Sequence, residues 1–276
     1  MHSRKKLLAT PHILWMLLFT VIPILVILFY SFTKPTDDGI IFTLENFQRF
    51  FDPIYIDVLL RSIYLAAVST IICLLLGYPM AVILSKSSLK SRNVLILLLI
   101  IPMWMNFLLR TYAWMNILEK SGLLNRFLDF IGLPTVDIMY TSSAVVLGMV
   151  YNFLPFMVLP IYTVLTKIDR RLIEAAQDLG ANKRTVFRKV TFPLSLPGVI
   201  SGITMVFMPA VTTFVISRLL GGGQYTLIGN LIEQQFLTTL DWNFGSSISV
   251  IMLIVILISM AIMSKYDKDK EGVGLW

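Results

Sequence analysis

Few side chains in this sequence are suited to catalysis or metal binding. The one cysteine, Cys73, lies inside an apolar run, so neither an intramolecular disulfide nor a multi-cysteine metal site is possible. His2 and His12 both lie near the N-terminus, which argues against a histidine-based catalytic triad or metal centre. The run Gly221-Gly222-Gly223 is followed by Gln224, not by the lysine and hydroxyl residue of a phosphate-binding loop. We therefore expect no catalytic residue, metal or cofactor in this chain, and any ATP must be bound by a partner chain.

The composition is that of an integral membrane protein. Of the 276 residues, 57% are hydrophobic and 14% are charged, whereas soluble domains carry roughly 25% charged residues. About 20 apolar residues in a helix span a membrane, so five of the six uncharged runs are long enough and the third is borderline. These runs cover residues 7–33, 62–85, 93–109, 138–166, 190–217 and 242–264. The sequence predicts an all-α integral membrane protein with six transmembrane helices.

The distribution of basic residues predicts the orientation of these helices. If the N-terminus lies in the cytoplasm, the inside segments hold 16 of the 23 lysines and arginines and the outside segments hold 7. Cytoplasmic loops are rich in lysine and arginine, so this arrangement is the favoured one. Both termini are therefore expected in the cytoplasm. The net charge of +7 reflects this topology and does not indicate a nucleic-acid partner.

The predicted spans lack the ionisable groups of an ion-coupled carrier. No aspartate or glutamate lies well inside any run, which disfavours coupling to protons or sodium ions. Arg110 lies near the outer end of the third run, close enough to snorkel to the interface, and we expect it to be structural or to contact an acidic binding protein. Gly198 and Gly202 form a small-residue face that permits close contact with another helix or another subunit.

The longest inside segment, residues 167–189, is predicted to fold into two short helices. Asp169 is suited to cap the first, and Gly180 is suited to end it. Asn182 is suited to cap the second, which we expect Phe192-Pro193 to end before the fifth span. One face of the first helix carries small and apolar residues, which favours a protein groove over a lipid surface. These residues are Leu172, Ala175, Ala176 and Leu179.

This segment resembles the Glu-Ala-Ala loop of ABC-type importer permeases. Glu174-Ala175-Ala176 is followed after three residues by Gly180, and nine residues later by Val190-Thr191-Phe192-Pro193. The resemblance implies a type I ABC importer permease architecture and a helix that couples to an ATPase subunit. It implies coupling through Glu174, Ala175, Ala176 and Gly180. The domains expected from it are an N-terminal helix and outer loop (1–60), a permease domain (61–265) containing the coupling loop 167–193, and a cytoplasmic tail (266–276).

Flanking motifs are similar to those of spermidine/putrescine permeases, and they favour a polyamine as the substrate. They are Thr43 to Phe47, Leu109 to Tyr112, Leu154 to Val158, Leu227 to Asn230, Gln235 to Leu237, and Asp241-Trp242. Related permeases for ferric iron, sulfate or phosphonates share the architecture and remain alternatives. The resemblance implies a prokaryotic inner-membrane location. The partners it implies are two ATP-binding subunits, a second homologous permease, an extracytoplasmic polyamine-binding protein and membrane lipid.

A polyamine crossing spans without carboxylates requires other groups that attract cations. Aromatic rings attract an ammonium by roughly 0.5–2 kcal/mol each. Candidates are Trp104 and Asn106 after Pro102, Tyr151 and Asn152 before Pro155, and Asp241 and Trp242 at the outer mouth. The alternative is that these aromatic rings pack between helices or at the lipid interface.

Three other arrangements remain open at this stage. A membrane enzyme would rely on Arg218, Glu233 and Asp241, the charges of the last outer loop, with no histidine or cysteine nearby. A secondary carrier would be favoured by an internal repeat, and the six-helix pattern shows none. The permease pair could also be a homodimer of this chain.

Overall fold

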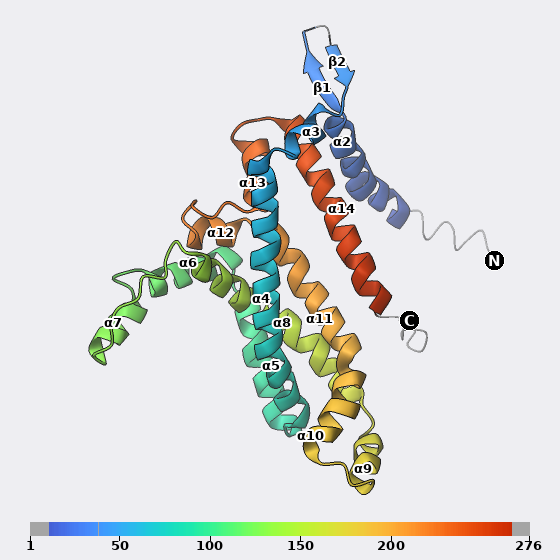
Figure 1. Ribbon diagram of the computed structural model, residues 1–276, viewed down its shortest axis with the longest axis vertical. Helices are drawn as coiled ribbons and strands as arrows, with labels where there is room; N and C mark the ends of the chain where they lie inside the picture. Colours follow the sequence, from blue (N-terminus) through green and yellow to red (C-terminus); the bar gives the residue numbers. More distant parts are fainter. Residues whose placement is uncertain (1–10, 38, 267–276) are drawn as a thin grey trace, which may run out of the picture. The chain divides into compact units, whose positions relative to one another are not determined.

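The computed structural model describes residues 11–37 and 39–266, with side chains up to residue 263 (Figure 1). Most of the described chain is helical, as the sequence predicts. Arg4, Lys5, Lys6, Lys268 and Lys270, which contribute to the predicted orientation, lie outside the described residues, as does nearly all of the predicted tail. The orientation and the predicted domain boundaries therefore stay predictions.

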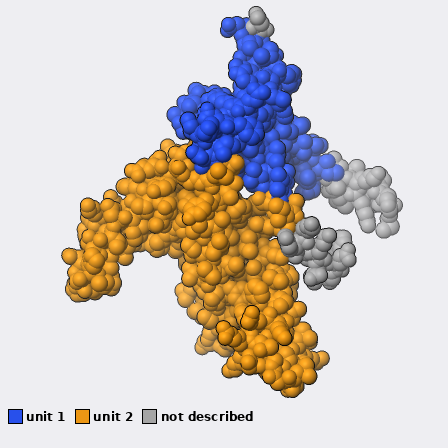
Figure 2. All heavy atoms as spheres, in the orientation of Figure 1, with its two compact units in different colours: residues 1–58, 231–258 blue, residues 59–230, 259–276 orange. Residues whose placement is uncertain are grey.

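The chain divides into two compact units, coloured separately in Figure 2. Unit 1 comprises residues 1–58 and 231–258, and unit 2 comprises residues 59–230 and 259–276. Unit 1 therefore joins an N-terminal segment to one from the last quarter of the sequence. Unit 2 contains the predicted coupling loop.

Unit 1 contains the first helix, a small hairpin and most of the last helix. Its elements are η1 (Leu17–Val21), α2 (Ile22–Ser31), β1 (Thr33–Thr36), β2 (Gly39–Phe42), α3 (Glu45–Phe50), the start of α4 (Pro53–Lys86), the end of α13 (Ile228–Leu237) and most of α14 (Trp242–Tyr266). The hairpin is antiparallel and pairs Thr33 with Phe42. The sequence did not predict it, because each strand has only four residues.

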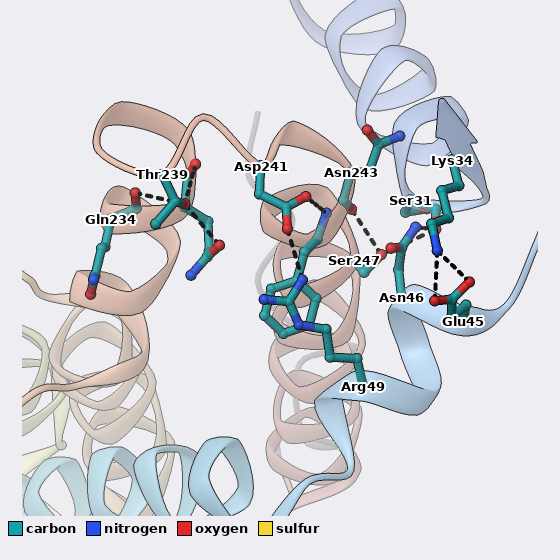
Figure 3. A network of polar contacts seen from close by, with 12 residues as sticks. Ser31, Lys34, Glu45, Asn46, Arg49, Gln234, Thr239, Asp241, Asn243 and Ser247 are labelled. Atoms are coloured by element: carbon teal, nitrogen blue, oxygen red, sulfur yellow. Dashed lines mark hydrogen bonds and ion pairs between the residues drawn. The ribbon is translucent and has the colours of Figure 1, made fainter. Parts of the chain in front are cut away.

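The C-terminal end of α2 is held by side chains from α3 and α14 (Figure 3). The Asn243 side-chain amide donates to the carbonyls of Tyr30 (3.0 Å) and Thr33 (2.8 Å). The Asn46 amide also donates to the Thr33 carbonyl, at 3.0 Å, and Ser247 donates to the Ser31 carbonyl, at 3.1 Å. The last carbonyls of a helix have no partner within the helix, so these donors stabilise the turn into the hairpin.

Unit 2 is built around α8, which packs closely against α11. Its elements are the rest of α4, α5 (Leu89–Trp104), α6 (Phe107–Leu118), α7 (Leu123–Phe130), α8 (Ser142–Lys167), α9 (Arg170–Asp178), α10 (Lys183–Val186), η2 (Phe187–Thr191), α11 (Phe192–Thr212), α12 (Val215–Leu220), the start of α13 and the end of α14. A Cβ atom on Gly198 would lie 2.9 Å from the Pro160 carbonyl oxygen, and one on Gly202 would lie 2.8 Å from the Met157 sulfur. The Gly198/Gly202 face is therefore a contact between helices of this chain.

Five helices are long and apolar enough to cross a membrane, and a bent pair makes a sixth if it counts as one span. The five are Pro11–Ser31, Pro53–Lys86, Ser142–Lys167, Lys183–Thr212 and Trp242–Met263. The bent pair, Leu89–Trp104 and Phe107–Phe130, turns by 97°. The apolar run 93–109 thus does not form one straight helix, because Met105 is extended and Asn106 begins a new helix.

Two of the long helices contain a π-turn just before a proline. Leu17–Val21 precedes Pro23, and Phe187–Thr191 precedes Pro193. Proline cannot donate to the carbonyl one turn back, and a wider turn accommodates this break in the helical ladder. The sequence-based expectation that Phe192-Pro193 ends the second short helix is therefore wrong. The helix continues from Lys183 to Thr212.

Candidate functional site

The predicted coupling helix is present and its local signals act as the sequence indicates. The Asp169 carboxylate accepts from the Arg171 backbone N–H at 2.9 Å and caps α9. Gly180 ends the helix with a φ of +80°, a left-handed conformation that favours glycine. The Gly180 N–H donates to Gln177 O (2.8 Å) and the Ala181 N–H donates to Ala176 O (3.0 Å), the bond pattern of a Schellman ending. Local residues thus determine both ends of α9.

One face of α9 is apolar and exposed within this chain. The side chain of Leu172 is 50% exposed and that of Leu179 is 89% exposed, and Ala175 lies exposed between them. Ala176, predicted on the same face, is only half-buried, and Glu174 is exposed. Exposed leucines on a short helix indicate a surface that a partner can cover. The face defined by Leu172, Ala175 and Leu179 is called the coupling face below.

A polar and aromatic cluster connects the chain that follows α9 to α4. Asn182 caps α10 by accepting from the Thr185 N–H at 2.9 Å, as predicted. Beyond it, the Tyr78 hydroxyl lies 2.9 Å from the Ser195 hydroxyl, and the Tyr78 ring centre lies 5.8 Å from those of both Phe187 and Phe192. These contacts join η2 and the start of α11 to the long helix α4. Sequence reasoning missed Tyr78, because its partners lie more than 100 residues away.

Trp104 and Asn106 flank the bend between α5 and α6. The Trp104 side chain is 76% exposed. The Asn106 side-chain oxygen Oδ1 accepts from the backbone N–H groups of Leu108 (2.8 Å) and Leu109 (3.4 Å), so this side chain caps α6. Asn106 therefore has a structural role that the sequence did not predict, whereas the Trp104 ring is not covered by other described parts of this chain.

Tyr151 and Asn152 lie in the middle of α8. The Tyr151 ring packs against the Trp114 ring in a T-shaped contact, with 5.1 Å between ring centres. Asn152 is 3% exposed, and its amide donates to the Gly148 carbonyl at 2.9 Å. The side-chain oxygen Oδ1 of Asn152 is buried and has no hydrogen-bond partner among the described residues. In the described structure, no ring contact or hydrogen bond joins Trp104 to Tyr151 or Asn152.

Asp241 and Trp242 both take part in contacts within unit 1 (Figure 3 shows Asp241). Asp241 accepts from Arg49 Nη1 at 2.8 Å, and its other oxygen accepts from the Phe244 N–H at 3.1 Å and caps α14. The Trp242 ring centre lies 5.7 Å from that of Phe236 and 6.4 Å from that of Tyr30. A cation that binds Asp241 must therefore compete with Arg49.

Arg110 is buried on α6, contrary to the expectation that it snorkels. The residue is 9% exposed, and its Nε atom has no partner among the described residues. Its guanidinium lies over the Phe107 ring, 5.9 Å from the centre. The sequence placed Arg110 at the end of a straight span, but the bend at Met105 puts it on a helix that contacts α8 and α12.

Comparison with known proteins agrees with this architecture. The family described as binding-protein-dependent transport system inner membrane component matches residues 5–269. The spermidine/putrescine transport system permease protein PotB of Escherichia coli strain K12 is 44% identical over 246 residues, which are 87% of this chain and 90% of the relative. PotB of Haemophilus influenzae is 40% identical over 263 residues, which are 93% of this chain and 91% of the relative.

A solved structure shares the fold. It is a bacterial alginate ABC transporter in complex with an alginate pentasaccharide-bound periplasmic protein. The TM-score is 0.81 at 16% identity, and the match covers 99% of this chain and 98% of that chain. The fold is that of a type I ABC importer permease, as the sequence predicts. The chain belongs to the family of binding-protein-dependent transport system inner membrane components.

Proposed function

We propose that this chain is a permease subunit of an ATP-driven importer of polyamines, spermidine or putrescine. The observation that carries the substrate class is the 44% identity to the PotB permease of E. coli over 87% of this chain. The chain forms one half of the translocation path and has no chemistry of its own. ATP is bound and hydrolysed by a partner chain.

The coupling face is the surface that meets this partner. Leu172, Ala175 and Leu179 lie exposed on one side of α9, and burial of a leucine contributes roughly 1.5–3 kcal/mol. Asp169 and Gly180 fix the ends of the helix, so the face is formed before the partner binds. Motion of α9 reaches α4 through the cluster around Tyr78.

The proposed assembly holds this chain, a second homologous permease, two ATPase subunits and an extracytoplasmic binding protein. The alginate transporter was solved with a periplasmic protein bound, which supports the last of these partners. A homodimer of this chain is the alternative for the permease pair. Mass determination of the purified membrane complex distinguishes one permease sequence from two.

The translocation path is proposed to use neutral and aromatic groups. Trp104 is exposed, and the buried side-chain oxygen of Asn152 can accept a hydrogen bond from an ammonium group in a conformation that opens the helix packing around it. Tyr151 is adjacent to Asn152 in the sequence, but its ring packs on Trp114, so it is a weaker candidate for the path than Trp104. Neutral acceptors and rings bind a polycation more weakly than a carboxylate, which permits release.

Reconstitution tests the proposal. The chain is placed in liposomes alone, or together with the partner permease, the ATPase and the binding protein, and labelled spermidine uptake is measured with and without ATP. We expect uptake only from the complete assembly with ATP. Uptake by the chain alone would assign it to the secondary carriers instead.

A further inference from the structure

A cavity of about 600 Å³ lies at the end of unit 2 where α4 and α8 finish and α5 begins. In Figure 1 the short helices α9 and α10 lie at this same end of the unit. The cavity is lined by residues of α4, α5, α8, α9, α10 and η2, and of the short connections between them. It is therefore enclosed by the coupling segment on one side and by the ends of the membrane helices on the other.

The charges around this cavity are unbalanced. Four cationic side chains line it, Lys86, Arg92, Arg170 and Lys183, with a single carboxylate, that of Glu174. The ion pairs formed within the described chain include none of these five residues. Four cations around one carboxylate repel one another unless an anion joins them. The lining is therefore suited to an anionic ligand.

The cavity lies on the opposite side of α9 from the coupling face. Arg170, Ile173, Glu174 and Gln177 line it, at the spacing of one helical face. Leu172, Ala175 and Leu179 do not line it and are exposed. An ATPase that covers the leucines thus leaves the cavity to another occupant.

The remaining lining is mixed, and its apolar part lies largely at the ends of membrane helices. The polar members are Ser85, Thr166, Gln177 and Thr191. Val82 lies in the last turns of α4 and Leu165 in the last turn of α8, and Ile168 follows α8 directly. Val186 ends α10 and Phe187 begins η2. A free phosphate ion gains nothing from contact with apolar side chains. A phospholipid, in contrast, has glycerol and acyl carbons directly beside its phosphate, and these carbons can pack against such side chains. Basic pockets between membrane helices are known sites for anionic headgroups.

We propose that this cavity binds the phosphate-bearing headgroup of an anionic phospholipid. Lys86 and Arg92 bind the phosphate from α4 and α5, and Arg170 and Lys183 bind it from α9 and α10. A single bound lipid then joins the coupling helix α9, together with α10, to the helices α4 and α5. The inference is independent of which substrate the transporter carries.

Photocrosslinking tests this site in the complex as it is purified from membranes. The complex is placed in phosphatidylcholine nanodiscs that contain a phosphatidylglycerol with a photoactivatable headgroup, and crosslinked peptides of this chain are quantified. The double variant Lys86→Gln/Arg92→Gln is expected to lower crosslinking to the cavity peptides by tenfold or more, since each basic residue contributes about fivefold. Glu174→Gln is expected to raise it.

Two control variants make the result specific. Lys90 is exposed between the two cations and does not line the cavity, so Lys90→Gln is expected to leave crosslinking unchanged. The exchange Lys86→Arg/Arg92→Lys keeps both charges and is expected to retain crosslinking. A loss that is equal in Lys90→Gln and in the double glutamine variant would overturn the proposal, and so would a loss in the charge-retaining exchange.

Two further arms identify the source of the anion. Inorganic phosphate is added during crosslinking, and the ATPase is removed in a parallel sample. Crosslinking that persists under both conditions supports a bound lipid. Full protection by inorganic phosphate would assign the site to a free anion, and crosslinking only after removal of the ATPase would assign it to that subunit. Either result overturns the proposal.

Discussion

The guanidinium Nη1 of Arg49 lies 2.8 Å from Oδ2 of Asp241, although 192 residues separate the two in the sequence. The same guanidinium lies 4.0 Å from the centre of the Phe244 ring. Burial alone would lower the pKa of Arg49, but hydrogen bonds with Asp241 and Tyr55 raise it, so the side chain stays charged. A carboxylate and an aromatic ring together form a cation site, and in this structure a side chain of the protein occupies it.

Competition between Arg49 and a polyamine at Asp241 gives the first prediction. Both partners are partly exposed, and such a pair contributes only about 0–1 kcal/mol, so a substrate ammonium can replace Arg49. Arg49→Gln is expected to lower the polyamine concentration for half-maximal uptake several-fold, and Asp241→Asn to raise it. Uptake is measured over a range of substrate concentrations. Changes of the same sign and size in both variants would indicate a purely structural ion pair.

The coupling face gives the second prediction. Leu179 is almost fully exposed in this chain, so Leu179→Ala is expected to change folding stability by less than about 0.5 kcal/mol. Loss of its burial against the ATPase is expected to weaken assembly about tenfold. Assembly is measured by titrating the ATPase onto the permease in detergent. Leu89→Ala, an exposed leucine at the same end of unit 2, is the control and is expected to bind normally.

Leu179 is a better test position than Ala176. An aspartate at Ala176 is expected to uncouple ATP hydrolysis from uptake, but Ala176 is half-buried. A charge at this position is therefore also expected to disturb the packing of α9 against the rest of this chain. If Leu179→Ala and Leu172→Ala both leave ATPase binding intact, the coupling face is not the docking surface.

The close packing of α8 and α11 gives the third prediction. A side chain on Gly198 meets the backbone of Pro160 and Ile161 at 2.9–3.0 Å, and a backbone cannot rotate away. Gly198→Val is expected to lower the free energy of unfolding by roughly 1–3 kcal/mol, seen as a lower melting temperature of the purified chain. Leu196→Ile, at a partly exposed position of the same helix, is expected to have little effect.

The partner permease provides a second readout for this face. Since α8 covers Gly198 and Gly202, a cysteine at either position is not expected to crosslink to the second permease. Efficient crosslinking between chains at Gly198, with an unchanged melting temperature for Gly198→Val, would place the face between subunits instead.

Trp104 gives the fourth prediction. Its exposure means that Trp104→Leu leaves the fold intact, so uptake reports on the ring itself. Loss of one contact between a cation and a ring is expected to reduce polyamine uptake by roughly 2- to 30-fold, with partial rescue in Trp104→Phe. Trp15→Leu, another exposed tryptophan, is the control. Normal uptake in Trp104→Leu would remove this residue from the path.

Features that depend on neighbouring residues were predictable from the sequence. Asp169, Gly180 and Asn182 act through backbone groups two to five residues away, and each has the predicted role. The apolar runs also gave the long helices, because membrane spans are defined by composition and length. Pro193 was misread, since the π-turn before it allows the helix to continue.

Features that depend on tertiary contacts were not predictable. The burial of Arg110 and the free oxygen of Asn152 follow from the bend at Met105 and from helix packing, which no local pattern encodes. The pairing of Arg49 with Asp241 is also a tertiary contact that no local pattern encodes. Resemblance to the Glu-Ala-Ala loop predicted the coupling residues, but only the structure shows that Glu174 lies on the cavity side of α9.

One measurement tests the central claim most directly: ATP-dependent uptake of labelled spermidine by the complete reconstituted transporter, with unlabelled competitors. We expect putrescine and spermidine to compete, and ferric iron, sulfate and phosphonates to have no effect. We also expect uptake to stop when this chain is omitted. Uptake of ferric iron, sulfate or a phosphonate without uptake of a polyamine would contradict the proposed function, although the chain would remain a permease of the same family.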